Sequence, residues 1–190
     1  MHRMCDDLRT EHDDEMIEKW ITGKTGFPFL DACMKFLQTY GWINFRMRAM
    51  IMSFASYNMW QPWQKTSPLL AKFFTDYEPG IHISQVQMQS GVTGINLPRI
   101  YSVSKQSMDQ DPNADWIKNL IPELSDFDSE SIHTAQLGES YLPQIINLKD
   151  SAKYARDRIW SIRKSKAFKN EAKLVYLRHG SRRKRNFKTN

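Results

Sequence analysis

Apolar residues recur at helical spacing along most of the chain, and no segment shows a convincing strand pattern. Pro28 stands in the first turn of a predicted helix that ends at Gly41, and the apolar side chains between them share one face. The pattern therefore predicts an all-α protein. Further helices are expected at 42–61, at 69–77, after the turn signal at 111–113 through Leu120, at 129–137, at 149–163 and at 167–179.

The segment that follows the helix at 69–77 contains few apolar positions. Glu78-Pro79-Gly80 is expected to end that helix. A polar, glutamine-rich stretch (81–91) and an extended connection (91–103) are expected to follow.

Two arginines interrupt the long apolar helix. Arg46 and Arg48 carry the only formal charges between Gly41 and Trp60. Burying an unpartnered guanidinium costs several kcal/mol or more, so each needs an anion, a ligand or a water-filled cleft. At about 100° per residue the two point about 200° apart, whereas Asn44 and Arg48 share a face. An amide and a cation there could contact one polar, partly anionic ligand; the alternative is two structural ion pairs at the helix edges.

Composition indicates a single domain without a membrane span. The 190 residues are 41% hydrophobic, enough for one substantial core, and no uncharged apolar run reaches 18 residues. The first twenty residues are mostly acidic and lack the apolar core of a signal peptide. Cys5 and Cys33 match no metal-ligand spacing, so reduced thiols and a cytoplasmic location are expected, with Cys33 in the core.

Charge is distributed unevenly along the chain. Residues 1–148 hold 12 Lys and Arg against 18 Asp and Glu, whereas residues 149–190 hold 15 against 3. A segment this basic suits a phosphate backbone or another polyanion. The alternative is a solvated basic tail with no single partner.

Short motifs occur in a defined order along residues 22–124. They are Gly23-Lys24-Thr25-Gly26-Phe27-Pro28, Asp31-Ala32-Cys33-Met34, Gly41-Trp42-Ile43-Asn44 with Arg46 and Arg48, Ser53-Phe54, Asp76-Tyr77-Glu78, Arg99-Ile100-Tyr101, Lys105-Gln106-Ser107, Asp109-Gln110-Asp111-Pro112 and Ile121-Pro122-Glu123-Leu124. In this order they resemble the photolyase/cryptochrome family, specifically the C-terminal half of its helical FAD-binding domain in a divergent prokaryotic branch. The resemblance implies that residues 1–190 form an incomplete, multi-helix FAD-binding domain with a basic helical tail at 149–190.

The resemblance also implies flavin-binding residues. Arg48 matches the arginine beside the flavin and would form a buried ion pair with Asp76, facing a polar cavity. Glu78 matches a position near the ribityl–adenine part of FAD, and His82 the position of an asparagine next to flavin N5. Asn44 stands one residue before a position where the family has asparagine.

Other matched positions concern electron transfer and DNA. Trp63 matches the middle tryptophan of the chain that photoreduces the flavin, but Val86 replaces the tryptophan nearest the flavin. Arg46 matches an arginine facing the damaged-DNA cavity, and Met88 replaces a tryptophan of that cavity. The basic tail is expected to contact DNA through Arg182, Arg183 and Arg185.

The function implied is that of an FAD-binding fragment of a light-dependent photolyase, which transfers an electron from reduced flavin to pyrimidine photoproducts in DNA. The family's phosphate-holding segment and its antenna domain are not in this sequence. The chain would therefore be a lyase only if the family's N-terminal half completed it, and a separate gene could encode that half. The chain alone is expected to bind FAD weakly or not at all. The alternatives are a cryptochrome-like blue-light signalling or nucleic-acid-binding module, and an inactive gene fragment.

Overall fold

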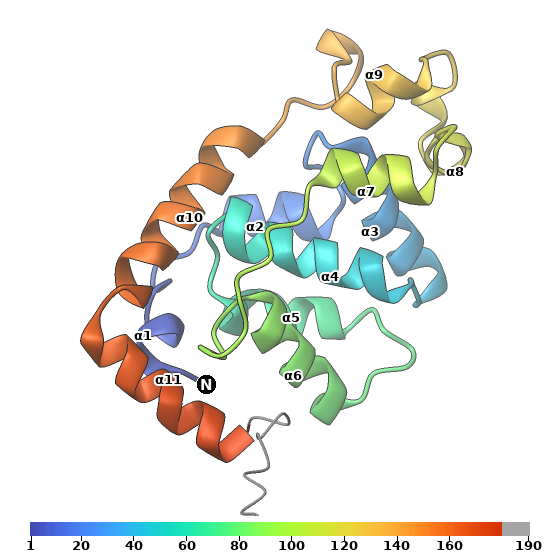
Figure 1. The fold of residues 1–190 in the computed structure, drawn as a ribbon. Coiled ribbons are helices and arrows are strands. Elements are labelled where there is room, and N and C mark those ends of the chain that lie inside the picture. The colour runs from blue at the N-terminus through green and yellow to red at the C-terminus, as the bar shows by residue number, and fades with distance from the viewer. Residues whose placement is uncertain (180–190) are drawn as a thin grey trace, which may run out of the picture.

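The computed structural model describes residues 1–179, and these residues form helices and loops without a strand (Figure 1). The all-α prediction is confirmed. The α-helices are α1 (Arg3–Asp6), α2 (Asp14–Ile21), α3 (Pro28–Tyr40), α4 (Phe45–Ser53), α5 (Trp63–Ala71), α6 (Pro79–Gln89), α7 (Val103–Gln110), α8 (Asp115–Leu120), α9 (Ser129–Thr134), α10 (Leu148–Arg163) and α11 (Lys166–His179). A π-helical turn (Phe54–Asn58) continues α4, and short 3-10 turns lie at Pro122–Leu124 and Gly138–Ser140.

Helix α3 lies at the centre of the main core. It contacts α2, α4, α7, α8 and α9, and Cys33 and Leu37 on it are fully buried. Pro28 occupies its first turn, and Gly41 ends it with a left-handed φ of 71°, as the sequence predicts. The α3 prediction is therefore correct at both ends because its start and stop signals are local.

The long helix predicted at 42–61 is wrong at both ends. Residues 42–44 are not helical, and Asn44 is the N-cap of α4, its side chain accepting a hydrogen bond from the Met47 amide at 3.0 Å. Asparagine is among the best N-cap residues, so α4 begins directly after it. At its other end α4 passes into the π turn, where the Met59 amide bonds to the Phe54 carbonyl at 3.0 Å.

Two further boundaries differ from the prediction. Helix α5 begins at Trp63 after Pro62 and includes Pro68, whereas the sequence predicted a helix only from residue 69. Pro79 begins α6 rather than ending a helix, because the Glu78 carboxylate accepts a 2.7 Å hydrogen bond from the Ile81 amide and caps the first turn. The glutamine-rich stretch is therefore helical.

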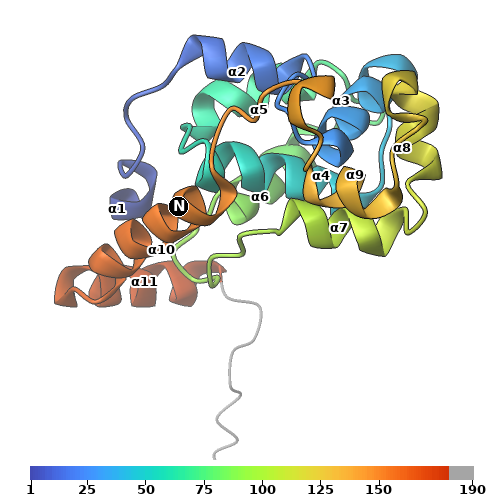
Figure 2. The same cartoon turned by 90° about the horizontal axis from the view of Figure 1, so that it is seen from above.

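Helices α10 and α11 lie along one side of the molecule, next to the N-terminus (Figures 1 and 2). His2 is fully buried and stacks on Phe168 of α11 with ring centroids 4.1 Å apart. The Arg3 amide donates to Glu171 at 2.8 Å. No helix within residues 1–179 combines the length and apolarity that crossing a bilayer requires.

Candidate functional site

A cavity of about 250 Å³ lies between α4, α5 and α6. Most of its wall is apolar, and its polar groups come from α4, the loop before α6, and α6 itself. The lining residues are Phe45, Arg48, Ala49, Met52, Leu70, Phe74, Asp76, Tyr77, Glu78, Ile81, His82, Gln85, Val86 and Gln89.

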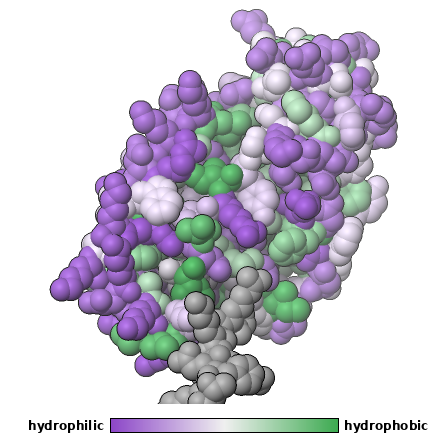
Figure 3. Space-filling view, viewed as in Figure 1, coloured by the Kyte–Doolittle hydropathy of each residue, from purple (hydrophilic) through white to green (hydrophobic). Residues whose placement is uncertain are grey.

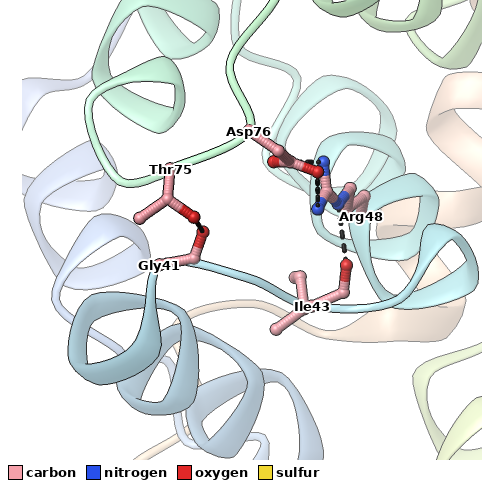
Figure 4. A network of polar contacts seen from close by, with 5 residues as sticks. All are labelled: Gly41, Ile43, Arg48, Thr75 and Asp76. Carbon is pink, nitrogen blue, oxygen red and sulfur yellow. Dashed lines mark hydrogen bonds and ion pairs between the residues drawn. The ribbon is translucent and has the colours of Figure 1, made fainter.

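Arg48 is held at the cavity by contacts with Asp76, Ile43 and Phe74, of which Figure 4 shows the first two. Its two Nη atoms donate to the two carboxylate oxygens of Asp76 at 3.1 and 2.9 Å, and Nε donates to the Ile43 carbonyl at 2.8 Å. Its guanidinium carbon also lies 4.3 Å from the centre of the Phe74 ring. A bidentate pair of this kind fixes the plane of the guanidinium as well as its position.

The loop before α6 is anchored so that Asp76 meets Arg48. The Thr75 amide and hydroxyl both donate to the Gly41 carbonyl, at 2.9 and 3.2 Å (Figure 4). The C-terminus of α3 thus positions a carboxylate from a loop 35 residues further along the chain.

The predicted Arg48–Asp76 ion pair is confirmed, but the predicted burial is wrong. The Arg48 side chain is 26% exposed and that of Asp76 is 47% exposed. The cavity is also apolar over most of its wall, not polar as expected. The pair lies at the cavity mouth, where α4 has solvent on one side; this is why a charge is tolerated on an otherwise apolar helix. Arg46 is exposed and does not line the cavity.

His82 lines the cavity and contacts Ser67 of α5 through one ring nitrogen. Its Nε2 lies 3.2 Å from the Ser67 carbonyl, which can only accept, so this nitrogen carries the hydrogen. The Ser67 hydroxyl lies 3.1 Å from the same atom. Desolvation is the main cause that lowers the pKa of His82; the charge of Arg48 lowers it further, and the bond to Ser67 raises it.

Two other predicted flavin residues act as helix caps. Glu78 lines the cavity, is exposed, and caps α6. Asn44 caps α4 and donates through Nδ2 to the Gln110 side chain at 3.1 Å, tying α4 to α7. Asn44 does not line the cavity, so it does not share a ligand with Arg48 in this geometry.

Of the described residues predicted for electron transfer and DNA, Trp63, Arg46 and Met88 do not line the cavity. Trp63 is half-buried at the start of α5, where its indole N–H donates to Asp6 at 2.8 Å. Val86 lines the cavity, whereas Met88 is half-buried and does not. Arg182, Arg183 and Arg185 lie outside the described residues.

Sequence reasoning missed Gln85 and Gln89 as cavity residues. Both lie on α6, and Gln85 Oε1 is buried without a hydrogen-bond partner in the described structure. The sequence signal for these cavity residues was the polar residues at positions 78, 82, 85 and 89, a spacing that places them on one face of a helix. It was overlooked because the stretch was expected to be non-helical.

Apolar side chains also surround the mouth of the cavity. Phe45, Tyr77 and Ile81 line it and are 57%, 45% and 65% exposed, and Trp42 nearby is 52% exposed. Large apolar groups gathered at one opening are typical of a binding surface. The described residues therefore form a cavity with walls on one side and an open apolar rim on the other.

These features define a helical cofactor-binding region, and comparison with known proteins identifies its family. Residues 1–161 match the FAD binding domain of DNA photolyase, so the chain belongs to the photolyase/cryptochrome family. FAD is the cofactor of this domain family, as expected from the sequence.

Relatives of both kinds match the chain. A deoxyribodipyrimidine photo-lyase of Alkalihalophilus pseudofirmus is 31% identical over 67% of this chain and 27% of its own length. A cryptochrome DASH of Oryza sativa subsp. japonica is 30% identical over 77% of this chain and 25% of its own length. The chain thus spans about a quarter of these relatives.

Solved structures agree on the fold. An archaeal photolyase from Sulfolobus tokodaii, described with two FAD molecules, superposes with a TM-score of 0.78 at 26% identity, over 84% of this chain and 38% of that one. A Synechocystis cryptochrome superposes with a TM-score of 0.73 at 24% identity, over 80% of this chain and 34% of that one.

Proposed function

We propose that the α4–α6 cavity holds part of the flavin of FAD, and that the chain is the C-terminal portion of a light-dependent photolyase acting on pyrimidine photoproducts in DNA. The observation that carries this is the bidentate Arg48–Asp76 pair at the mouth of an apolar cavity. An isoalloxazine ring has broad apolar faces and a polar edge, and the cavity offers apolar walls with polar groups at one side.

The residues present fit the flavin end of the cofactor. Arg48 would keep a fixed positive charge beside the ring, and Asp76 would hold that guanidinium in plane. Neutral His82 would offer a polar edge without adding charge, and the unpaired Gln85 Oε1 would accept a hydrogen bond from a ring N–H. When bound, reduced flavin supplies the electron given to the photoproduct, while these side chains position the ring and exclude water.

The residues present do not serve the phosphates of FAD. Among the described residues that line the cavity, Arg48 is the one cation, and Asp76 already neutralises it. A cavity of about 250 Å³ is also below the usual range of roughly 300–1,000 Å³ for small-molecule sites. We infer that a further segment, such as a separately encoded N-terminal half, supplies the second wall against the apolar rim.

Titration of FAD with the purified chain tests this proposal. The chain alone is expected to bind FAD weakly, and Arg48→Met is expected to abolish the remaining quenching of flavin fluorescence. Arg46→Met is the matched control, since it removes an exposed cation two residues away that does not line the cavity.

Two results would contradict the proposal. Purified chain that retains stoichiometric flavin through gel filtration would show that no second wall is needed. Equal weakening by Arg48→Met and Arg46→Met would show that the cavity is not where flavin binds.

A cryptochrome-like signalling role, or a nucleic-acid-binding module, is the second candidate. It is favoured by Val86, which lines the cavity where the family has the tryptophan nearest the flavin, and by the position of Trp63 outside the cavity. The rate at which blue light reduces the bound flavin, measured in the completed protein, tests whether Trp63 takes part in electron transfer. Reduction that survives Trp63→Phe would exclude Trp63 from electron transfer.

A further inference from the structure

Two hollows lie away from the α4–α6 cavity, between the connection 91–103 and helices α10 and α11. They measure about 270 and 410 Å³, and Trp160 belongs to the wall of both. The first is lined by Leu97, Pro98, Ile100, Arg156, Ile159 and Trp160. We call the two hollows together the Trp160 groove.

Trp160 is exposed in this groove and its surroundings are fixed. Its side chain is 46% exposed, although it lies between apolar residues of two chain segments. Arg163 donates to the Asn96 carbonyl at 3.2 Å and lies 5.7 Å from the Trp160 ring centre and 5.0 Å from that of Phe168. An indole face beside a restrained guanidinium is a preformed stacking surface.

The charge of the Trp160 groove is of one sign. Its described lining contains Arg156, Arg163 and Lys169 and no carboxylate. Residues 149–179 carry ten Lys and Arg against three Asp and Glu. On the face seen in Figure 3, hydrophilic residues border the edge where α10 and α11 lie, and apolar residues gather just inside it. A polyanion with apolar faces is the ligand that complements this arrangement.

We propose that the Trp160 groove binds single-stranded DNA, with an unpaired base stacked on Trp160 and adjacent phosphates contacted by Arg156, Arg163 and Lys169. A single strand is favoured over a duplex because only unpaired bases offer a face for stacking. An anionic membrane surface is disfavoured because the apolar residues line hollows rather than a projecting face. The proposal does not depend on the flavin site.

Fluorescence anisotropy with two labelled probes tests this. One probe is a 12-nucleotide oligothymidylate, and the other is a 12-unit abasic strand with the same phosphates and no bases. At one fixed salt concentration, Trp160→Ala is expected to weaken oligothymidylate binding about tenfold or more and to leave abasic binding nearly unchanged. Trp160→Phe, which keeps a stacking ring, is expected to recover most of the affinity.

Tyr154→Ala is the matched control. Tyr154 lies on the same helix, is 49% exposed, and is not part of the groove wall. The Tyr154→Ala variant should bind both probes as the unaltered chain does. Circular dichroism should show the same helicity for all variants.

Several results would overturn the proposal. The unaltered chain could fail to bind oligothymidylate, or it could bind it equally before and after Trp160→Ala. Equal weakening of binding to both probes by Trp160→Ala would show that the cations alone bind the strand. Trp160-dependent binding to vesicles of anionic lipid, without oligothymidylate binding, would assign the groove to a membrane. Because no flavin is present, none of these outcomes bears on the proposed cofactor site.

Discussion

Arg9 and Arg48 show how differently one residue type is accommodated in this fold. Arg9 is only 6% exposed, and its guanidinium lies over the rings of Tyr57 and Trp60, 5.2 and 4.4 Å from their centres. It donates a hydrogen bond to the Ser90 carbonyl at 3.1 Å, and burial lowers its pKa to about 10. Arg48, by contrast, reaches a carboxylate at a partly exposed cavity mouth, where such a pair contributes about 1 kcal/mol or less.

His82 gives a prediction at the scale of one residue. Its folded-state pKa lies below the ordinary value of 6.5, so the unfolded chain takes up a proton at a pH where the folded chain does not. The contribution of His82 to stability is therefore full above pH 6.5 and is lost as the pH drops through 6.5 toward the folded-state pKa. Between about pH 7.5 and pH 5.5, His82→Gln is expected to lose less stability in urea denaturation than the unaltered chain.

Exposed His179 provides the control for this measurement. The variant His179→Gln is the comparison for the loss of one exposed histidine outside the cavity. If His82→Gln and His179→Gln show the same pH dependence of stability, His82 is not desolvated in the fold.

At the scale of elements, hydrogen bonds at the start of α3 hold the loop that contains Tyr141. The fully buried Asp31 carboxylate accepts hydrogen bonds from the Thr25 amide and hydroxyl at 2.8 and 2.6 Å, from the Gly26 amide at 3.0 Å and from the Tyr141 hydroxyl at 3.0 Å. Burial raises the pKa of Asp31, and these bonds oppose that rise. The network joins the start of α3 to the connection before α10.

Gly26→Ala tests this joint. Gly26 has a φ of +80°, and a Cβ there would meet the Pro143 carbonyl oxygen at 2.5 Å. The left-handed conformation costs a non-glycine residue about 1–2 kcal/mol, and the clash adds about 1–3 kcal/mol. In urea denaturation, Gly26→Ala is expected to lower the free energy of unfolding by the sum of these two costs.

The chain provides a matched control for the backbone effect. Gly138 has a φ of +56°, and a Cβ added there would meet nothing within 4 Å. Gly138→Ala should therefore show the conformational cost alone. Equal losses at the two positions would contradict the close contact between Gly26 and Pro143.

At the scale of the whole molecule, the basic charge is concentrated on the α10–α11 side. The acidic and apolar features of the cavity lie on other elements, α4 to α6. The molecule thus presents a cationic side to any polyanion, while its cofactor cavity opens elsewhere.

The expected consequence is salt-sensitive binding to duplex DNA without sequence preference. Each phosphate neutralised contributes about 0.9 to the slope of log affinity against log salt, so four or five engaged cations give a slope of roughly −4. Titration of labelled duplex at several salt concentrations measures it. A slope near zero would leave these charges a role in solubility alone, and equal binding after deletion of residues 178–190 would exclude the cations of that segment from DNA binding.

The sequence by itself determined the helices whose signals are local. Helix α3 follows from Pro28 and Gly41, and α10 and α11 lie within one residue of their predicted bounds, because caps and periodicity act over a few neighbouring residues. The Arg48–Asp76 pairing was also predictable, but through the family resemblance and not from spacing.

Only the tertiary structure decided the remaining features. The burial of Arg9 depends on contacts with Tyr57, Trp60 and Ser90, which are distant in the sequence. The cavity has the same origin, since it exists only where α4, α5 and α6 meet. Burial and enclosure are properties of assembled helices, and a local pattern cannot determine which face another segment will cover.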